Sequence, residues 1–180
     1  MNILQVSKHF SYSGVTTHII DLSRELQRRG NKVVILTSGG PLIKKLEEEG
    51  LKYYLLPFTS LNPFKMIRNL FSVCKIIKEE KIDIAHTHWR STGIYLKIAS
   101  LFKKFKFVWT NHLNHIPTDF VRRNLTFYGN KALTVSTDMV KMLNEEIKIP
   151  MDKIKVVFNG IYENKYIHYD EDRIKELKEK

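Results

Sequence analysis

The chain has 180 residues, 43% of them hydrophobic, with only eight glycines and five prolines, which excludes a disordered or low-complexity chain and predicts one globular core. It has no run of about 18 apolar residues and no signal-peptide pattern at Met1, and its one cysteine, Cys74, cannot form an internal disulfide, so we expect a cytoplasmic protein. The net charge of +11 favours an anionic partner, and residues 63–106 alone carry ten basic against three acidic side chains.

Apolar stretches of strand length alternate with stretches of helical period along nearly the whole chain. Local signals mark several helix ends: Gly30 and Gly50 close two helices, and Asn62 caps a third that Pro63 begins. In chain order we expect strand 3–6, helix 16–29, strand 33–36, helix 41–49, strand 51–56, helix 63–81, strand 82–85, helix 92–104, strand 107–110, helix 119–128, strand 132–135, helix 137–146 and strand 155–158. This alternation predicts an α/β fold, a Rossmann-like doubly wound parallel sheet of about seven strands with helices on both faces.

Histidines follow the fourth and fifth predicted strands. His86 and His88 come at the end of the fourth strand, and His112 and His115 follow the fifth. Open α/β sheets bind ligands at the carboxyl ends of their strands, so we expect a site here. Alternating residues share a strand face, yet only two of these histidines are local to one another and no Asp or Cys lies nearby, whereas zinc usually takes at least three protein ligands. We therefore expect no metal site, and a buried, hydrogen-bonded His86.

Seven motifs occur in one order along the chain. They are Met1-Asn-Ile-Leu-Gln-Val-Ser7, Ser13-Gly-Val15, Leu22-Ser-Arg-Glu-Leu26 running on to Arg29-Gly-Asn-Lys-Val-Val-Ile-Leu-Thr37, Asp83-Ile-Ala-His-Thr-His88, Thr110-Asn-His112, Leu133-Thr-Val-Ser136 and Val156-Val-Phe-Asn-Gly-Ile161. In this order and spacing the sequence resembles the N-terminal domain of family 4 glycosyltransferases, which are retaining enzymes with the two-domain GT-B fold. Phe158 and Tyr162 replace the proline and aspartate of the family's last motif.

The resemblance implies a domain organisation and an activity. Residues 1–162 would form the Rossmann-like N-terminal half of a GT-B fold, and residues 163–180 a linker or the start of a missing donor-binding domain. The whole enzyme would move a sugar from a nucleotide-sugar donor to a glycan or lipid-linked acceptor in cell-envelope or polysaccharide synthesis. The nucleotide-sugar is a substrate, no metal or other cofactor is expected, and the isolated chain would be inactive because it holds half of the site.

The resemblance also implies roles for particular residues. His112 would approach the transferred sugar and is the candidate catalytic residue. The loop before the first helix would receive the donor diphosphate, because the first N–H groups of a helix are unpaired, with Lys8, His9 and Gly14 as contacts. Expected acceptor or cleft contacts are His88, Trp89, Arg90, Asn111 and His115, and Asn159 and Gly160 form the linker signature.

Other interpretations of the same residues stay open. The basic helices 63–81 and 92–104 also carry apolar residues, which suits a peripheral protein on the anionic inner face of the cell membrane, but core packing and a solvated basic surface explain them too. The loop before the first helix could be an ordinary turn, and His112 and His115 ordinary loop histidines. The chain could be a non-catalytic sugar-binding or regulatory module. We expect no nucleic-acid partner, because neither a recognition helix nor an aromatic RNA-binding strand pattern is recognisable.

Overall fold

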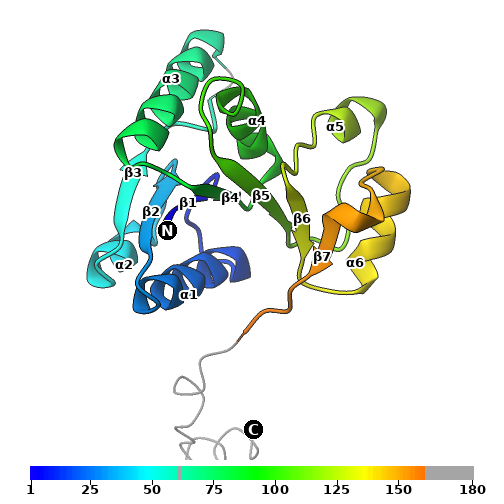
Figure 1. The fold of residues 1–180 in the computed structure, drawn as a ribbon, viewed down its shortest axis with the longest axis horizontal. Helices are drawn as coiled ribbons and strands as arrows, with labels where there is room; N and C mark the ends of the chain where they lie inside the picture. Colours follow the sequence, from blue (N-terminus) through cyan, green and yellow to red (C-terminus); the bar gives the residue numbers. More distant parts are fainter. Residues whose placement is uncertain (61, 161–180) are drawn as a thin grey trace, which may run out of the picture.

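The predicted strands pair into one parallel sheet. The computed structural model describes residues 1–60 and 62–160, and its strands are β1 (Asn2–Val6), β2 (Lys32–Thr37), β3 (Lys52–Leu55), β4 (Ile84–Thr87), β5 (Lys106–Asn111), β6 (Lys131–Thr134) and β7 (Ile154–Val156). The strand order is β3-β2-β1-β4-β5-β6-β7, and every neighbouring pair is parallel (Figure 1). The chain winds outward from β1 on one side and from β4 on the other, so these two central strands flank the switch point of a doubly wound sheet. The predicted fold class is confirmed.

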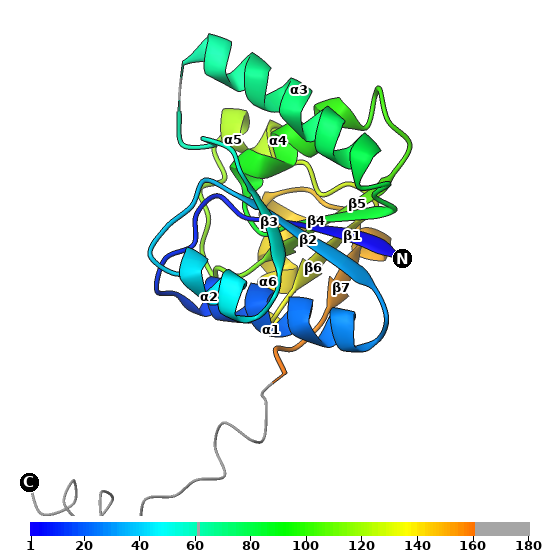
Figure 2. The ribbon, with the colours of Figure 1, turned by 90° about the vertical axis from the view of Figure 1, so that its left-hand side faces the viewer.

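Helices cover both faces of the sheet. They are α1 (Gly14–Arg28), α2 (Ile43–Glu48), α3 (Pro63–Glu79), α4 (Arg90–Ala99), α5 (Phe120–Asn124) and α6 (Asp138–Lys141), followed by a π turn (Met142–Glu146) and a 3-10 turn (Met151–Lys153). Figure 2 shows α1 and α2 on one side of the sheet and α3 and α4 on the other. The expected cap of α3 is confirmed, since the Asn62 side chain accepts hydrogen bonds from the N–H groups of Phe64 and Lys65.

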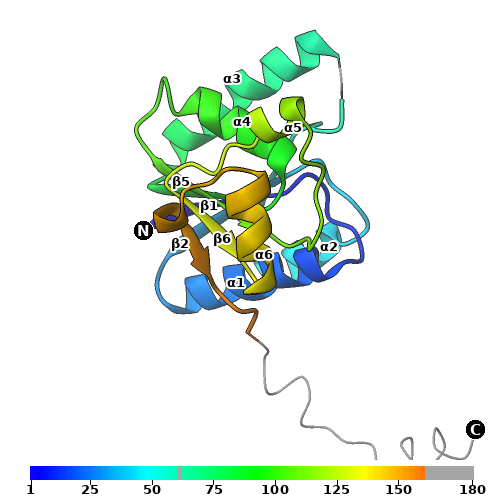
Figure 3. The ribbon, with the colours of Figure 1, turned by 90° about the vertical axis from the view of Figure 1, so that its right-hand side faces the viewer.

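Alternating strand residues supply a core to each helical layer. On the side of α3 and α4, Leu4 of β1 packs in one cluster with Val73 and Leu96. On the other side, Ile35 of β2 packs with Ile19 of α1 in a second cluster. The central strands are therefore apolar on both faces, as buried parallel strands must be. A third hydrophobic cluster lies at the β7 end of the sheet, where α6 and the π turn lie beside β6 (Figure 3).

Several predicted helices are shorter than expected, including α2, which spans Ile43–Glu48 where residues 41–49 were expected. The helix expected over 92–104 ends at Ala99, the one over 119–128 spans only α5, and the one over 137–146 changes to a π turn after α6. None of the five described residues of α5 is buried, so packing does not extend it. The segment after α5 instead passes close to α4, where the carbonyl oxygen of Phe127 lies 2.9 Å from the position that a Cβ on Gly93 would take.

Two expectations concern the end of the chain and the membrane. The expected domain boundary at residue 162 and the segment 163–180 lie outside the described residues. Within the described part of the chain, no helix is both long enough and apolar enough to cross a membrane.

Candidate functional site

Strand alternation places a row of polar side chains on the sheet face that α1 covers. Gln5 of β1 is aligned with Ile35 of β2, which packs on α1, and with His86 of β4 on its other side. His88 lies two residues beyond His86 and therefore points to the same face. His86 Nε2 is 2.6 Å from the hydroxyl oxygen of Thr110 on β5, which carries the row across to the next strand.

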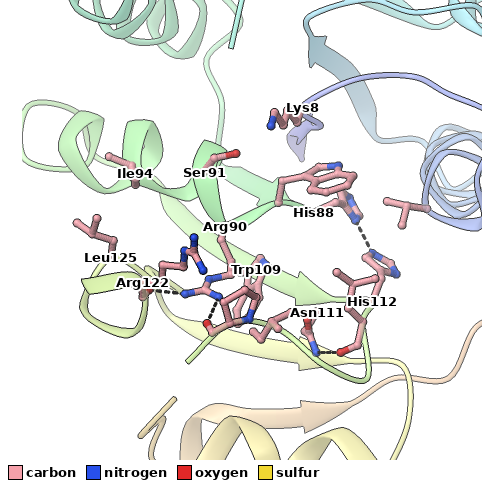
Figure 4. Close-up of a pocket in the computed structure, with 15 residues that line it drawn as sticks. Lys8, His88, Arg90, Ser91, Ile94, Trp109, Asn111, His112, Arg122 and Leu125 are labelled. Carbon is pink, nitrogen blue, oxygen red and sulfur yellow. Dashed lines mark hydrogen bonds between the residues drawn. The ribbon is translucent and has the colours of Figure 1, made fainter. Parts of the chain in front are cut away.

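A hydrogen-bonded chain links Gln5, His88 and His112. His88 Nε2 lies 2.8 Å from Gln5 Oε1. His88 Nδ1 lies 3.0 Å from His112 Nε2 (Figure 4). An amide oxygen only accepts, so His88 Nε2 carries the proton and, in a neutral ring, His88 Nδ1 accepts from His112 Nε2–H. His112 then keeps an unprotonated Nδ1. The sequence did not indicate Gln5 as part of the site, because one glutamine within an apolar strand carries no signal.

Burial keeps these histidines neutral near pH 7. His88 is only 4% exposed, and burial, together with the neighbouring histidines, lowers its pKa well below the usual value. Burial and the positive charge that His18 can carry lower the pKa of His112 to about 4. Burial followed by the charges of His18 and His112 lowers the pKa of His86 to about 3. Each ring has lost much of the water that would solvate its cationic form.

His18 joins the cluster from α1, and sequence analysis did not predict it. Its ring centroid lies 5.0 Å from that of His112 and 5.6 Å from that of His88. Burial lowers its pKa, and a side-chain hydrogen bond with Asn159 opposes that shift. The expectation that only two histidines would be local is therefore wrong. The available signal was that α1 follows β1, the strand at the switch point, so its first turns had to pack near that point.

A cavity of about 370 Å³ opens beside the histidines, between the loop after β1, α4, the loop after β5, and α5 (Figure 4). Most of its lining is apolar, from Val15, Trp89, Ile94, Trp109, Leu113, Ile116, Pro117 and Leu125. Its polar lining comes from Lys8, His88, Arg90, Ser91, Asn111, His112 and Arg122. An apolar cavity with a few convergent polar groups is typical of ligand sites, and the three basic side chains favour an anionic ligand.

Two of the expected cleft residues also shape the cavity wall. The Arg90 guanidinium donates to the carbonyl oxygen of Pro117 at 2.7 Å and to that of Arg122, which ties the start of α4 to the segment after β5. Asn111 is buried, and its Nδ2 donates to the carbonyl oxygen of Leu113 at 2.8 Å. Both side chains therefore hold the long loop that carries His112.

The structure places most of the expected site residues at the cavity and leaves the others away from it. Lys8 lines the cavity, and the ring centroid of His9 lies 5.0 Å from that of Trp89. Gly14 is exposed at the start of α1, directly after the N-cap residue Ser13. His115 is exposed in the loop after β5 and does not line the cavity. Of the linker signature, Asn159 reaches His18, and Gly160 is exposed.

Comparisons with known proteins give a family and a fold. The sequence matches the profile of Glycosyltransferase Family 4 over residues 12–165. A search of curated proteins gives no match. A solved glycosyltransferase from Rickettsia africae ESF-5 is 27% identical, with a TM-score of 0.80 over 99% of this chain and 48% of that chain.

Two further solved structures are similar in fold. Anabaena HepE, solved in complex with UDP-glucose, is 18% identical, with a TM-score of 0.79 over 99% of this chain and 49% of that one. The lipopolysaccharide outer core galactosyltransferase WaaB is 16% identical, with a TM-score of 0.71 over 89% of this chain and 46% of that one. This chain thus spans about half the length of the structures that it matches. Because the family match covers most of the chain, the protein belongs to glycosyltransferase family 4, and its domain is like the N-terminal half of the GT-B glycosyltransferases.

Proposed function

We propose that this chain is the acceptor-binding half of a retaining glycosyltransferase that moves a sugar from a nucleotide-sugar donor to a glycan or lipid-linked acceptor. One observation carries the proposal. In a family 4 domain, His112 stands at the cavity wall beside the switch point and is held there through His88 by Gln5. The complex of HepE with UDP-glucose supports a UDP-sugar as donor. A second domain would supply most donor contacts, and transfer itself would need no metal.

The proposed role of His112 follows from its protonation. With Nε2–H donated to His88, the neutral ring offers Nδ1 as an acceptor for a hydroxyl group of the transferred sugar. Such a contact positions the sugar and can strengthen as charge develops in the transition state. Lys8, on the loop before α1, lines the same cavity and would face the donor diphosphate.

The lining of the cavity supports a route without an enzyme nucleophile. None of the described side chains that line it is a carboxylate. We propose that the acceptor hydroxyl oxygen bonds to the anomeric carbon on the face from which the phosphate leaves. The bond to the phosphate oxygen breaks, and that oxygen takes the hydroxyl proton. Configuration is retained because attack and departure share one face.

Two surfaces support a lipid-linked acceptor. The cavity combines apolar walls with Lys8, Arg90 and Arg122, which fits a molecule with an apolar part and a negative charge. On α3, Phe64 and Phe71 are 81% and 71% exposed, and they lie at helical spacing on a basic helix. We propose that this face of α3 contacts the anionic inner leaflet and that the enzyme is cytoplasmic and peripheral. WaaB acts in the lipopolysaccharide outer core, which supports an envelope glycan as acceptor.

The test compares two histidine variants in a protein that carries both halves of the enzyme. His112→Ala should lower turnover with UDP-glucose by roughly 10²–10³-fold, or about 3–4 kcal/mol, since it removes one preorganised group from the transition state. His115→Ala, exposed and outside the cavity, is the matched control and should keep turnover. Melting temperature is measured for both variants.

The outcomes separate the interpretations. Near-wild-type turnover by His112→Ala would remove its catalytic role, and a large fall in melting temperature would make it a structural histidine. Binding of UDP-sugars without turnover of any would favour the sugar-binding or regulatory module. The isolated 180-residue chain should bind UDP-glucose weakly in calorimetry and transfer nothing, and clear transfer would refute the half-site proposal.

A further inference from the structure

Three imidazole rings from three separate elements converge on one point. His18 comes from α1, His88 from the end of β4 and His112 from the loop after β5, and one nitrogen of each lies within 4.8 Å of the others. His88 Nδ1 and His112 Nε2 are already 3.0 Å apart. In a tetrahedral zinc site with Zn–N bonds of about 2.0–2.1 Å, ligand nitrogens are roughly 3.3 Å apart, so this pair nearly has the required spacing.

We propose that His18, His88 and His112 bind one divalent first-row transition metal ion, with Zn²⁺ as the natural candidate and the fourth coordination position open to the cavity. Three neutral nitrogen ligands suit zinc, copper, nickel or cobalt and do not suit Mg²⁺ or Ca²⁺, which take oxygen ligands. Three histidines and one open position is also an established ligand set for zinc.

The surroundings prepare His88 and His112 as ligands. His88 donates Nε2–H to Gln5 Oε1 at 2.8 Å, which fixes the ring and leaves Nδ1 as the ligand atom, as hydrogen bonds to the second nitrogen do in known metal sites. The metal would replace the proton that His112 Nε2 now donates to His88 Nδ1. That proton would move to His112 Nδ1. No net proton is released, because burial already keeps both rings neutral.

The third ligand closes the site from the helix side. His18 is partly exposed on α1 and shares a side-chain hydrogen bond with Asn159, so it can turn inward without rearranging a strand. A small rotation of this ring is the movement that coordination requires. The site therefore joins α1 to the ends of β4 and β5 across the switch point.

Metal binding would have a regulatory consequence, and this part of the inference rests on the proposed function. An ion on His112 would draw this ring away from the sugar, so metal would inhibit a transfer reaction that itself needs none. The binding test below uses neither donor nor acceptor. It can therefore fail while transfer succeeds, or succeed while transfer fails.

The experiment titrates Co²⁺ into the 180-residue chain at pH 7 and records its visible spectrum. We expect one Co²⁺ per chain, absorption bands as intense as those of four-coordinate Co²⁺, and loss of the bands when one equivalent of Zn²⁺ is added. His18→Gln should weaken Co²⁺ binding at least tenfold, and Gln5→Leu by about 10–100-fold as a loss of ligand support. His115→Gln, exposed in the loop after β5, is the control and should bind as the parent chain does.

Several results would overturn the site. These are the absence of four-coordinate bands, bands that persist unchanged in His18→Gln, or an equal loss in the His115→Gln control. Because His88 is buried, His18→Gln is the deciding variant, and its melting curve is required to match that of the parent chain. Equal competition by Mg²⁺ would also contradict a nitrogen site.

Discussion

The histidines beneath α1 act as neutral hydrogen-bonding groups because the protein has removed their water. His86 is buried, and its Nε2 lies 2.6 Å from the Thr110 hydroxyl, while His88 bonds Gln5 and His112. Charging one ring would place a cation in a poorly solvated site beside other imidazoles. The fixed positive charge of the cavity therefore comes from Lys8 and the arginines, and the imidazoles supply directed contacts.

These buried histidines should make stability depend on pH in a defined window. The usual histidine pKa of 6.5 applies to the unfolded chain, whereas burial lowers the pKa of His86 to about 3 and of His112 to about 4 in the folded protein. Between pH 6.5 and about 4 the unfolded chain binds more protons, so the free energy of unfolding falls as pH falls, by at most about 1.4 kcal/mol per pH unit for each histidine. The pKa of Glu80 is lowered to about 2, so this carboxylate also stabilises the folded chain. That contribution to the free energy of unfolding is lost only as pH falls below 4.5, the usual pKa of a glutamate.

Urea unfolding between pH 4.5 and 7.5 measures this dependence. His86→Gln should lower the slope of unfolding free energy against pH by about 1.4 kcal/mol per pH unit, the effect of one bound proton. The exposed control His115→Gln should lower this slope much less. A free energy of unfolding that stays flat between pH 6.5 and 4.5 would contradict burial of neutral histidines.

At the scale of elements, one buried carboxylate joins α3 to two strands. Glu80 is only 4% exposed at the end of α3, and it pairs with Lys32 of β2 at 2.8 Å and Lys52 of β3 at 2.7 Å, with a further hydrogen bond from the Tyr54 hydroxyl. Burial alone would raise the pKa of this carboxyl, and the hydrogen bonds from the two lysines and the tyrosine outweigh burial. Nothing local in the sequence distinguishes it from the neighbouring Glu79.

The two adjacent glutamates give a matched pair of variants. Glu80→Gln should lower the free energy of unfolding by about 1–3 kcal/mol, because it weakens charge-assisted hydrogen bonds at a buried position. Glu79→Gln removes an exposed carboxylate 3.8 Å from Lys75 and should cost less than about 1 kcal/mol. Denaturant unfolding at pH 7 compares them, and equal losses would show that the buried network has no special weight.

The loop that carries Lys8 depends on a close approach of two backbone segments. A Cβ on Gly40 would lie 2.2 Å from the carbonyl oxygen of Phe10, and Gly40 has a φ of +144°. The same segment holds the loop through Phe10 N–H to the Gly39 carbonyl oxygen at 2.9 Å. Only glycine fits this position without moving the loop before α1.

Gly40→Ala should therefore destabilise the chain by at least about 1–3 kcal/mol. Gly14→Ala is the control, because nothing lies within 4 Å of the added Cβ at the start of α1 and its φ is not positive. It should change stability by less than about 1 kcal/mol, in the stabilising direction. A melting temperature for Gly40→Ala equal to that of Gly14→Ala would refute the requirement for glycine.

At the scale of the whole molecule, the parts of the fold that could be predicted are those set by periodicity. Buried parallel strands are continuous apolar runs, and their alternation with helical stretches predicted a parallel sheet with helices on both faces. The predicted length of α5 was wrong because it depends on packing that the sequence pattern does not show. Its residues are not buried, and the chain after it passes over Gly93 instead.

The site could be predicted only where strands end. His86 is the penultimate residue of β4, His88 and His112 directly follow β4 and β5, and parallel strands bring their ends together. His18 and Gln5 join them through helix packing and cross-strand pairing, which depend on the orientation of α1 and the register of β1 with β4. Neither is encoded locally.

The last prediction concerns the face of α3 as a membrane contact. Phe64, Ile67 and Phe71 are exposed at helical spacing beside Lys65 and Arg68, and the whole chain carries a net charge of +11. An apolar ridge among cations can enter the headgroup region of an anionic bilayer, where each basic residue near the surface contributes about 1 kcal/mol.

The chain should therefore sediment with anionic vesicles at low salt and detach as salt screens the attraction, with little binding to neutral vesicles. Burying one Phe side chain is worth about 1.5–3 kcal/mol, so Phe71→Ser should weaken vesicle binding by roughly tenfold or more. Phe158→Ser is the matched control, since Phe158 is 70% exposed just after β7 and lies outside α3. Equal binding to neutral and anionic vesicles, or equal losses in the two variants, would leave the basic, apolar face of α3 as solvated surface without a membrane role.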